Sequence, residues 1–229
     1  MAWPVVVTGG CAISSVLAWG AYHPASPLFG HTLHRLPSDG TIALTFDDGP
    51  NPAVTPRLLN LLARSNVRGT FFLIGRWARA YPSIVKDIVA AGHTIGNHTT
   101  THPNLLWLST ARIVAELTEC QHIVEDVVGI KPSMVRPPFG ARGAQFSRAV
   151  RRSGLRRVVT WTLLGRDWSA RGQQRLIAQL QRAKGGDIVV LHDGSFDAPG
   201  ADRQATVRAL EHWLPRWRDA GFELQPLDG

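Results

Sequence analysis

The chain has 229 residues, of which 44% are hydrophobic and 18% are charged, and this favours one globular domain and excludes a disordered chain, a collagen and a coiled coil. The formal charge of +8 favours acidic partners. Because no nucleic-acid-binding motif accompanies the arginines, we expect no nucleic acid among those partners.

The amino-terminal residues 1–34 form an apolar segment in which no Asp, Glu, Lys or Arg precedes Arg35. Its stretch Val5–Tyr22 is barely long enough to span a bilayer and contains small residues suited to signal-peptide cleavage. We interpret the segment as a signal peptide, a membrane anchor or a peripheral arm, with residues 1–22 as the part that would associate with a membrane. Residues 35–229 are expected to form the single folded domain.

Short β-type runs alternate with longer helical patterns from residue 41 onward, which is typical of βα units and a parallel sheet. No internal repeat or linker interrupts this alternation. The predicted strands are Thr41–Phe46, Thr70–Ile74, Thr94–Gly96, Met134–Arg136, Arg157–Trp161, Ile188–Leu191 and Phe222–Leu224.

The helical patterns between these strands begin with capping signals. Thr55 is predicted as an N-cap followed by Pro56, Pro82 should open the next helix, and Ser109 should cap a third. An α/β chain with seven strands and about six helices fits a barrel-like closure or an open doubly wound sheet, and periodicity alone does not choose between them. The remaining predicted helices are Ala144–Ser153, Arg171–Ala183 and Ala205–Ala220.

Five polar clusters follow predicted strands at their carboxyl ends. Each cluster alone could be a turn or a rigid loop. In parallel α/β folds, however, the carboxyl ends of the strands form one rim where active sites are built, so we expect the clusters to converge there. The clusters are Asp47-Asp48-Gly49, Asn97-His98, Arg136–Gly140, Asp167-Trp168 and His192-Asp193.

A metal site is predicted from one pair of histidines and one pair of acids. His98 and His102 are four residues apart, a spacing that brings two imidazoles onto one face of a helical turn. A carboxylate from Asp47 or Asp48 would complete a ligand set that catalytic zinc and non-haem iron both use. The metal would hold one carboxylate ionised and leave the other free to accept a proton.

Five motifs in chain order resemble those of the polysaccharide deacetylases with NodB homology, also called carbohydrate esterase family 4. They are Thr45–Pro50, His98–Pro103, Arg136–Gly140, Arg166–Trp168 and Leu191–Asp193. The resemblance spans about residues 41–224 and implies a deformed (β/α)7 barrel. It also implies a hydrolase of carbon–nitrogen bonds that uses a metal-activated water to remove acetyl groups from N-acetylglucosamine units of peptidoglycan, chitin or chito-oligosaccharides.

The resemblance also implies roles for individual residues. Asp48, His98 and His102 would bind a divalent metal, with Zn²⁺ as the expected ion and Co²⁺, Ni²⁺ or Mn²⁺ as alternatives. Asp47 would be the general base that takes a proton from the attacking water, and Arg136 would pair with it and keep it ionised.

The resemblance implies that His192 protonates the departing amine and that Asp167 stabilises the protonated imidazole. The backbone N–H of Phe139 would bind the oxyanion. Leu164 stands where the fourth motif usually has another Asp, so the sugar specificity stays open. The substrate pocket would be formed by Pro138, Phe139, Trp168 and Leu191.

Several alternatives remain open for the activity and the location. They are deacetylation of acetylxylan esters, deformylation of a lipid-linked amino sugar, ring opening of a small cyclic amide, an iron oxygenase with the same ligand types, and a glycan-binding pseudoenzyme without turnover. The apolar amino terminus favours the cell envelope, exported or membrane-anchored, with the cytoplasm as the alternative. The sequence predicts no oligomeric state.

Overall fold

The computed structural model describes residues 5–168 and 172–227 of the chain, with side chains from residue 14 onward. The strands are β1 (Thr41–Asp47), β2 (Thr70–Leu73), β3 (Thr94–Asn97), β4 (Met134–Val135), β5 (Arg157–Val158), β6 (Leu163–Leu164), β7 (Ile188–His192) and β8 (Glu223–Gln225). The α-helices are α1 (Val5–Tyr22), α2 (Thr55–Arg64), α3 (Gly75–Ala80), α4 (Pro82–Ala90), α5 (Thr110–Val128), α6 (Ala144–Arg152), α7 (Gly172–Leu180) and α8 (Gln204–Asp219). Two short 3₁₀ helices are η1 (Leu105–Trp107) and η2 (Pro138–Gly140).

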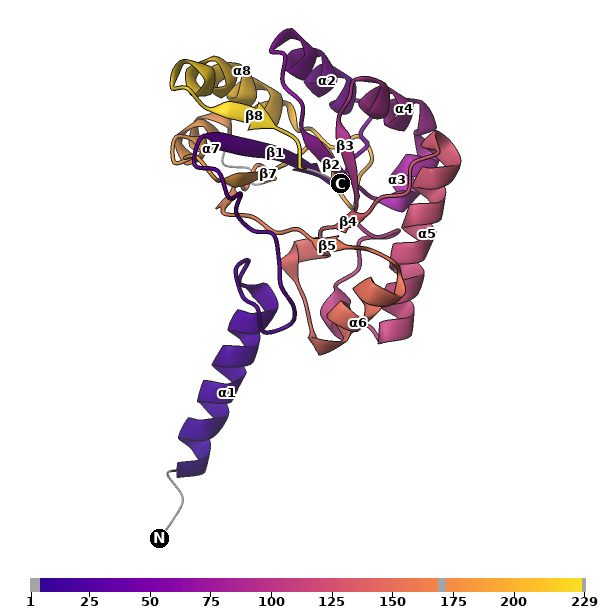
Figure 1. Ribbon diagram of the computed structural model, residues 1–229, viewed down its shortest axis with the longest axis vertical. Coiled ribbons are helices and arrows are strands. Elements are labelled where there is room, and N and C mark those ends of the chain that lie inside the picture. The colour runs from indigo at the N-terminus through magenta and orange to yellow at the C-terminus, as the bar shows by residue number, and fades with distance from the viewer. Residues whose placement is uncertain (1–4, 169–171, 228–229) are drawn as a thin grey trace.

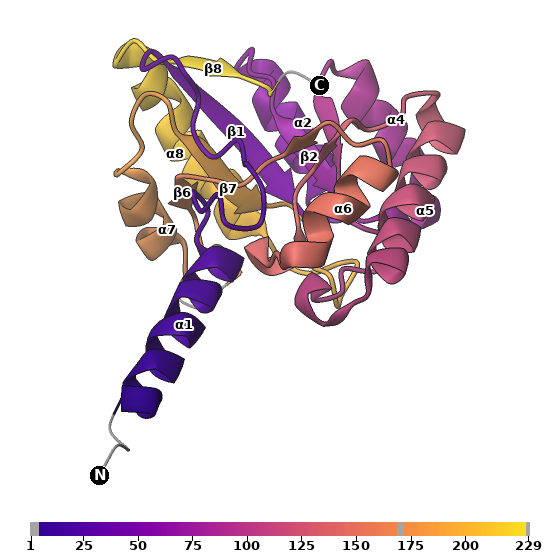
Figure 2. The same ribbon diagram turned by 60° about the horizontal axis from the view of Figure 1, so that its bottom comes forward.

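The strands form one curled parallel sheet in the order β5-β4-β3-β2-β1-β7-β6, and β8 pairs with the start of β1. Helices α2 to α5 cover one side of its outer face and α7 and α8 cover the other (Figure 1, Figure 2). Because β5 and β6 stand at the two ends of the order, the described strands do not close the ring. This confirms the deformed (β/α)7 barrel and the single domain, in place of a doubly wound sheet.

Side-chain alternation along the strands separates the barrel interior from the helix-covered outside. On β1, Leu44 and Phe46 belong to the large apolar core under the helices, whereas Ala43 belongs to a smaller interior cluster. Asp47 lies four residues after Ala43 on the same strand, so its side chain points to the same face. It therefore faces the barrel interior at the end of β1. On the adjacent strand β7, the Cα of His192 pairs with that of Asp47. The parallel register thus sets a carboxylate and an imidazole side by side at the carboxyl rim.

The predicted N-cap of the first barrel helix is wrong, because α2 already includes Thr55. Val54 occupies the N-cap position and contributes no side-chain hydrogen bond. The Thr55 hydroxyl is used elsewhere: it accepts a hydrogen bond from Asn51 N at 2.8 Å and donates to a carboxylate oxygen of Asp193. A contact from the end of β7 therefore overrides the local capping preference.

The other two predicted helix starts agree with the structure. Pro82 opens α4 and Ser109 caps α5 by accepting a hydrogen bond from a backbone N–H, and both predictions are confirmed. Helix α7 ends at Leu180 instead of Ala183, and its predicted first residue, Arg171, lies outside the described residues.

Beyond the 3₁₀ helices η1 and η2, two elements were not predicted, α3 and β6. They contain six and two residues, too few for a periodic pattern to show. The predicted fifth strand ends at Val158 instead of Trp161, and the chain then pairs again as β6. The pair Asp167-Trp168 therefore follows β6, not β5 as expected.

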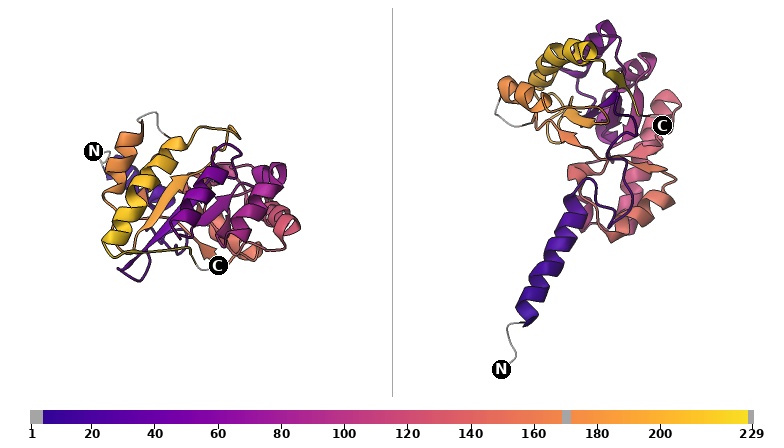
Figure 3. Two further views of the ribbon diagram at one scale, coloured as in Figure 1. Left: turned by 90° about the horizontal axis from the view of Figure 1, so that it is seen from above. Right: turned by 60° about the vertical axis from the view of Figure 1, so that its left-hand side comes forward.

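The amino-terminal helix α1 projects from the barrel as a rod (Figure 1, Figure 3). Among the described residues, no helix combines the length and the apolar character needed to cross a membrane. The end of α1 and the chain after it contact the barrel: Arg142 N donates to Ala21 O at 3.0 Å, and Leu33 forms a parallel bridge with Val159. The segment between α1 and β1 is therefore held against the barrel.

Candidate functional site

Three side chains able to bind a metal meet at the carboxyl rim of the barrel. Asp48 follows β1 and His98 follows β3. Asp48 Oδ1 lies 3.5 Å from His98 Nε2 and 3.3 Å from His102 Nε2. All three residues are buried, and their donor atoms lie within 4.8 Å of one another. The structure thus brings together the three residues that the motifs nominated as ligands.

The two histidines converge through loop geometry and not through the expected helical turn. Residues 98–102 form a loop in which Thr99 and His102 adopt left-handed φ angles of 66° and 62°. Asp48 also has a left-handed φ, of 71°. Residues with a Cβ adopt this conformation at a cost, and such residues gather at functional sites. These backbone angles direct the side chains of Asp48 and His102 into the cluster.

The donor set fits a divalent cation. His98 Nδ1 donates a hydrogen bond to the carbonyl of Arg136 at 2.7 Å, so the lone pair of His98 Nε2 is left for the cluster. In the described part of the chain, Asp48 Oδ1 and His102 Nδ1 are buried without a hydrogen-bond partner. Burial and the nearby His98 lower the pKa of His102 to about 3, so its imidazole stays neutral and available as a ligand. Two imidazoles and one carboxylate are a ligand set of catalytic zinc sites.

The second carboxylate, Asp47, is held by an arginine instead. Asp47 Oδ1 accepts a hydrogen bond from Arg136 Nη1 at 2.7 Å, and both side chains are buried. Arg136 also donates to Thr45 Oγ1 at 2.8 Å and to Thr160 O at 3.0 Å. Its guanidinium lies over the ring of Phe72, 4.2 Å from the centroid. Burial lowers the pKa of Arg136 and the Asp47 carboxylate opposes that shift, so the two groups form a charged pair.

An imidazole and an acid form a third unit, at the end of the neighbouring strand β7. His192 Nδ1 donates to Asp167 Oδ1 at 2.8 Å, and His192 N donates to Asp167 Oδ2 at 2.7 Å. Thr206 Oγ1 donates to the same Oδ2 at 2.6 Å. Burial is the largest single influence and favours neutral His192, but the charge and hydrogen bond of Asp167, with the charges of Asp48 and Asp47, together raise the pKa of His192 to about 9. The imidazole is therefore protonated at neutral pH.

One cavity of about 460 Å³ joins the three units. Two of the predicted substrate residues, Phe139 and Trp168, line it and are half exposed. Phe139 has a left-handed φ of 58°, and Trp168 meets the ring of His192 edge-on at 4.9 Å. The other lining residues are Asp47, Asp48, His98, His102, Pro137, Gly140, Trp161, Leu164, Val190, His192, Ser195, Phe196, Asp197 and Arg203.

The other two predicted substrate residues do not line this cavity, which corrects the expectation. Leu191 is fully buried in the core under the helices, because strand alternation turns it away from the interior. Its neighbour Val190 faces the cavity. Pro138 is buried as well, and Pro137 takes the lining position.

Sequence reasoning missed several residues that shape the site. Phe196 stacks on the ring of His102 with centroids 4.7 Å apart and planes at 8°, and Trp161 forms part of the wall. Fully buried Arg142 donates to Gly140 O and His23 O and so ties the loop of Phe139 to the segment after α1. No motif marked these residues, since each acts through a partner distant in sequence.

Known proteins are similar to this chain over most of its length. The family model for polysaccharide deacetylases matches residues 34–158. A chitooligosaccharide deacetylase of Azorhizobium caulinodans is 36% identical over 209 residues, which are 87% of this chain and 99% of that protein. A peptidoglycan-N-acetylglucosamine deacetylase of Bacillus cereus is 34% identical over 84% of this chain and 89% of its own length. A crystal structure of a peptidoglycan N-acetylglucosamine deacetylase superposes with a TM-score of 0.78 at 31% identity, covering 85% of this chain and 89% of the other.

Proposed function

We propose that this chain, which belongs to the polysaccharide deacetylase family, hydrolyses the acetamide of N-acetylglucosamine units in peptidoglycan, chitin or chito-oligosaccharides. One observation carries the proposal: a buried cluster of two histidines and a carboxylate adjoins a second carboxylate, Asp47, which an arginine holds. Attack of water on an amide is promoted by a Lewis acid that polarises the carbonyl and by a separate base that accepts the proton.

Asp48, His98 and His102 would hold the ion. Zn²⁺ suits this ligand set best, and Co²⁺, Ni²⁺ or Mn²⁺ are the alternatives. When bound, such an ion supplies Lewis acidity, which polarises the acetamide carbonyl and lowers the pKa of water toward about 7. The remaining steps are performed by residues of the chain.

Asp47 takes a proton from the attacking water. Arg136 donates to Asp47 Oδ1, and this hydrogen bond fixes the orientation of the carboxylate. Because Arg136 is itself held by Thr45 and Thr160, the base keeps its place through the reaction. The backbone N–H of Phe139 would stabilise the developing oxyanion, a contribution worth about 2.7–4 kcal/mol where such donors have been removed from other enzymes.

His192 gives a proton to the amide nitrogen as the carbon–nitrogen bond breaks. This step is needed because an amide anion is a very poor leaving group. Nδ1 of His192 is bound to Asp167, so Nε2 is the nitrogen that can serve the cavity. The products are acetate and the free amine of glucosamine.

The competing functions explain less of this arrangement. A glycan-binding pseudoenzyme needs none of the groups that face the cavity together: Asp47, Asp48, His98, His102 and His192. An iron oxygenase has no use for a protonated imidazole in the same cavity as the metal ligands. An acetyl ester has a better leaving group than an amide, so the protonated imidazole favours amide cleavage.

Acetate release from chito-oligosaccharides, peptidoglycan and acetylxylan tests the proposal. We expect release from the N-acetylated glycans, a loss of more than about 100-fold after chelation, and recovery when Zn²⁺ is returned. Parallel additions of Co²⁺, Ni²⁺ and Mn²⁺ rank the ions. Release from acetylxylan alone would contradict the amide substrate, and binding of glycan without release by the metal-loaded protein would indicate a binding protein.

We also propose that the enzyme acts at the cell envelope and that residues 1–22 attach it to a membrane surface. In support, no charged residue precedes Arg35, and the last turns of α1 expose Val16, Leu17, Trp19 and Tyr22. The full chain is expected to float with lipid vesicles in a density gradient, whereas a chain that begins at residue 23 stays in the soluble fraction. Equal flotation of both would contradict this attachment.

A further inference from the structure

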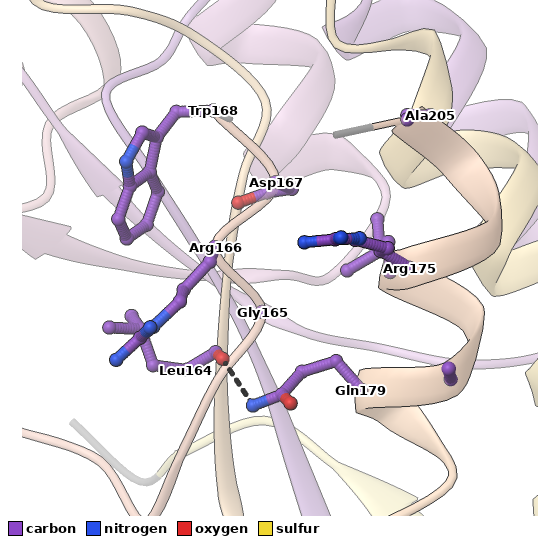
Figure 4. Close-up of a pocket in the computed structure, with 11 residues that line it drawn as sticks. Leu164, Gly165, Arg166, Asp167, Trp168, Arg175, Gln179 and Ala205 are labelled. Atoms are coloured by element: carbon purple, nitrogen blue, oxygen red, sulfur yellow. Dashed lines mark hydrogen bonds between the residues drawn. The ribbon is translucent and has the colours of Figure 1, made fainter. Parts of the chain in front are cut away.

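A second cavity lies beside the site cavity, between the segment that follows β6 and helix α7 (Figure 4). Its volume is about 650 Å³, larger than the 460 Å³ of the site cavity. Leu164 and Trp168 line both cavities and so form a shared wall. We call the second cavity the arginine groove. Its lining residues are Leu164, Gly165, Arg166, Asp167, Trp168, Gly172, Arg175, Leu176, Ala178, Gln179 and Ala205.

The groove carries two cations with no matching acid. Arg166 and Arg175 are exposed, and within residues 5–168 and 172–227 neither guanidinium forms an ion pair or a hydrogen bond. Asp167 is the acid of the lining, and its oxygens are already used by His192 and Thr206. The groove therefore has an uncompensated positive charge.

The two segments that carry the arginines are joined by a hydrogen bond. Gln179 Nε2 donates to Leu164 O at 3.0 Å and ties α7 to β6. Figure 4 shows Arg175 reaching from α7 toward the segment that carries Arg166. Arg166 itself has a left-handed φ of 58°, a conformation that residues with a Cβ adopt only where the surroundings impose it. Both arginines line the groove, and in Figure 4 the Arg166 side chain extends on the side of its segment away from Arg175.

We propose that the arginine groove binds a carboxylate carried by the glycan close to the acetamide under hydrolysis. Guanidinium groups recognise carboxylates through paired N–H donors. The peptide stems of peptidoglycan end in carboxylates, whereas chito-oligosaccharides carry no negative charge. Because the groove adjoins the site cavity at Leu164 and Trp168, we expect one glycan strand to contact both cavities. The enzyme thus prefers acidic peptidoglycan strands, an inference that rests on the proposed function.

A matched pair of substrates tests the groove: a peptidoglycan fragment with free stem carboxylates, and the same fragment with those carboxylates converted to amides. The measured quantity is the ratio of kcat/KM for the acidic fragment over the amidated one. The ratio is independent of how much enzyme is folded. We expect it to exceed one, to fall about fivefold in Arg166→Gln or Arg175→Gln, and to fall further in the double variant.

Two control variants distinguish binding in the groove from a general effect of positive charge on the protein. Arg175→Lys keeps the charge and should retain part of the preference. Arg152→Gln removes an exposed cation from α6, away from the groove, and should leave the ratio unchanged. A ratio near one in the natural chain, a ratio unaltered by both groove variants, or an equal fall in Arg152→Gln would each overturn the proposal.

The groove can also be tested if the proposed function fails. Titration calorimetry with the two fragments measures binding directly in the natural chain and in the double variant. Tighter binding of the acidic fragment that disappears in the double variant supports the groove even where no acetate is released. Acetate release with equal binding of both fragments overturns the groove and leaves the deacetylase standing.

Discussion

Replacing Asp47 by Asn is expected to abolish deacetylation while leaving the bound metal near one ion per chain. The substitution removes the proton acceptor, and loss of a general base typically costs about 10²–10⁴ in rate. It should not remove a ligand, because Asp47 pairs with Arg136 whereas Asp48 faces the two histidines. Single-turnover acetate release and elemental analysis of the same preparation measure the two quantities.

Asp48→Asn is the matched control, since it makes the same chemical change at the next residue. We expect it to lose both the metal and the activity. The amide introduced by Asp47→Asn would keep an oxygen acceptor for Arg136 but leave the buried guanidinium charge uncompensated, so thermal unfolding should be measured alongside. Loss of metal from Asp47→Asn, with metal retained in Asp48→Asn, would show that the two acids have exchanged roles.

Replacing His192 by Ala should suppress amide cleavage by about 10²–10⁴, and should suppress cleavage of an activated acetate ester much less. The difference arises because a phenolate leaves without protonation, whereas the glucosamine nitrogen does not. The measurement is kcat/KM for a chito-oligosaccharide and for 4-nitrophenyl acetate with the same enzyme. Equal losses on both substrates would remove the general-acid role.

The pH dependence of the natural chain gives an independent check on His192. Against the effect of burial, Asp167 together with Asp48 and Asp47 raises the pKa of His192 to about 9, so the proton donor is present below that pH and is lost as the pH rises through it. Amide turnover should fall over that range, and ester turnover should not share this loss. A common alkaline limb for both substrates would assign the titration to another group.

Much of the fold could be predicted because its signals are local. The alternation of short apolar runs and amphipathic helices, Pro82 at a helix start and Ser109 at a cap depend on neighbouring residues alone. The failures have tertiary causes. Thr55 is drawn from its capping role by Asp193, and β6 is a two-residue strand that exists because β7 is there to pair with it.

For the candidate site too, some features could be predicted from the sequence and others depend on tertiary structure. The residue types at the strand ends identified the acids and imidazoles, because parallel strands bring their carboxyl ends to one rim. Spacing did not distinguish Asp47 from Asp48. The structure separates them: strand alternation points Asp47 to Arg136, and a left-handed φ of 71° turns Asp48 to the histidines. Leu191 lies outside the cavity for the same reason of alternation.

By itself, the sequence determined which chemical groups this protein has and that they follow strands. Both properties depend only on residues that are neighbours in the chain. Tertiary structure decided how far the sheet curls, which acid joins the histidines, and that Arg166 and Arg175 flank one groove. These features depend on backbone angles and on contacts between segments far apart in the chain, and no local pattern records either.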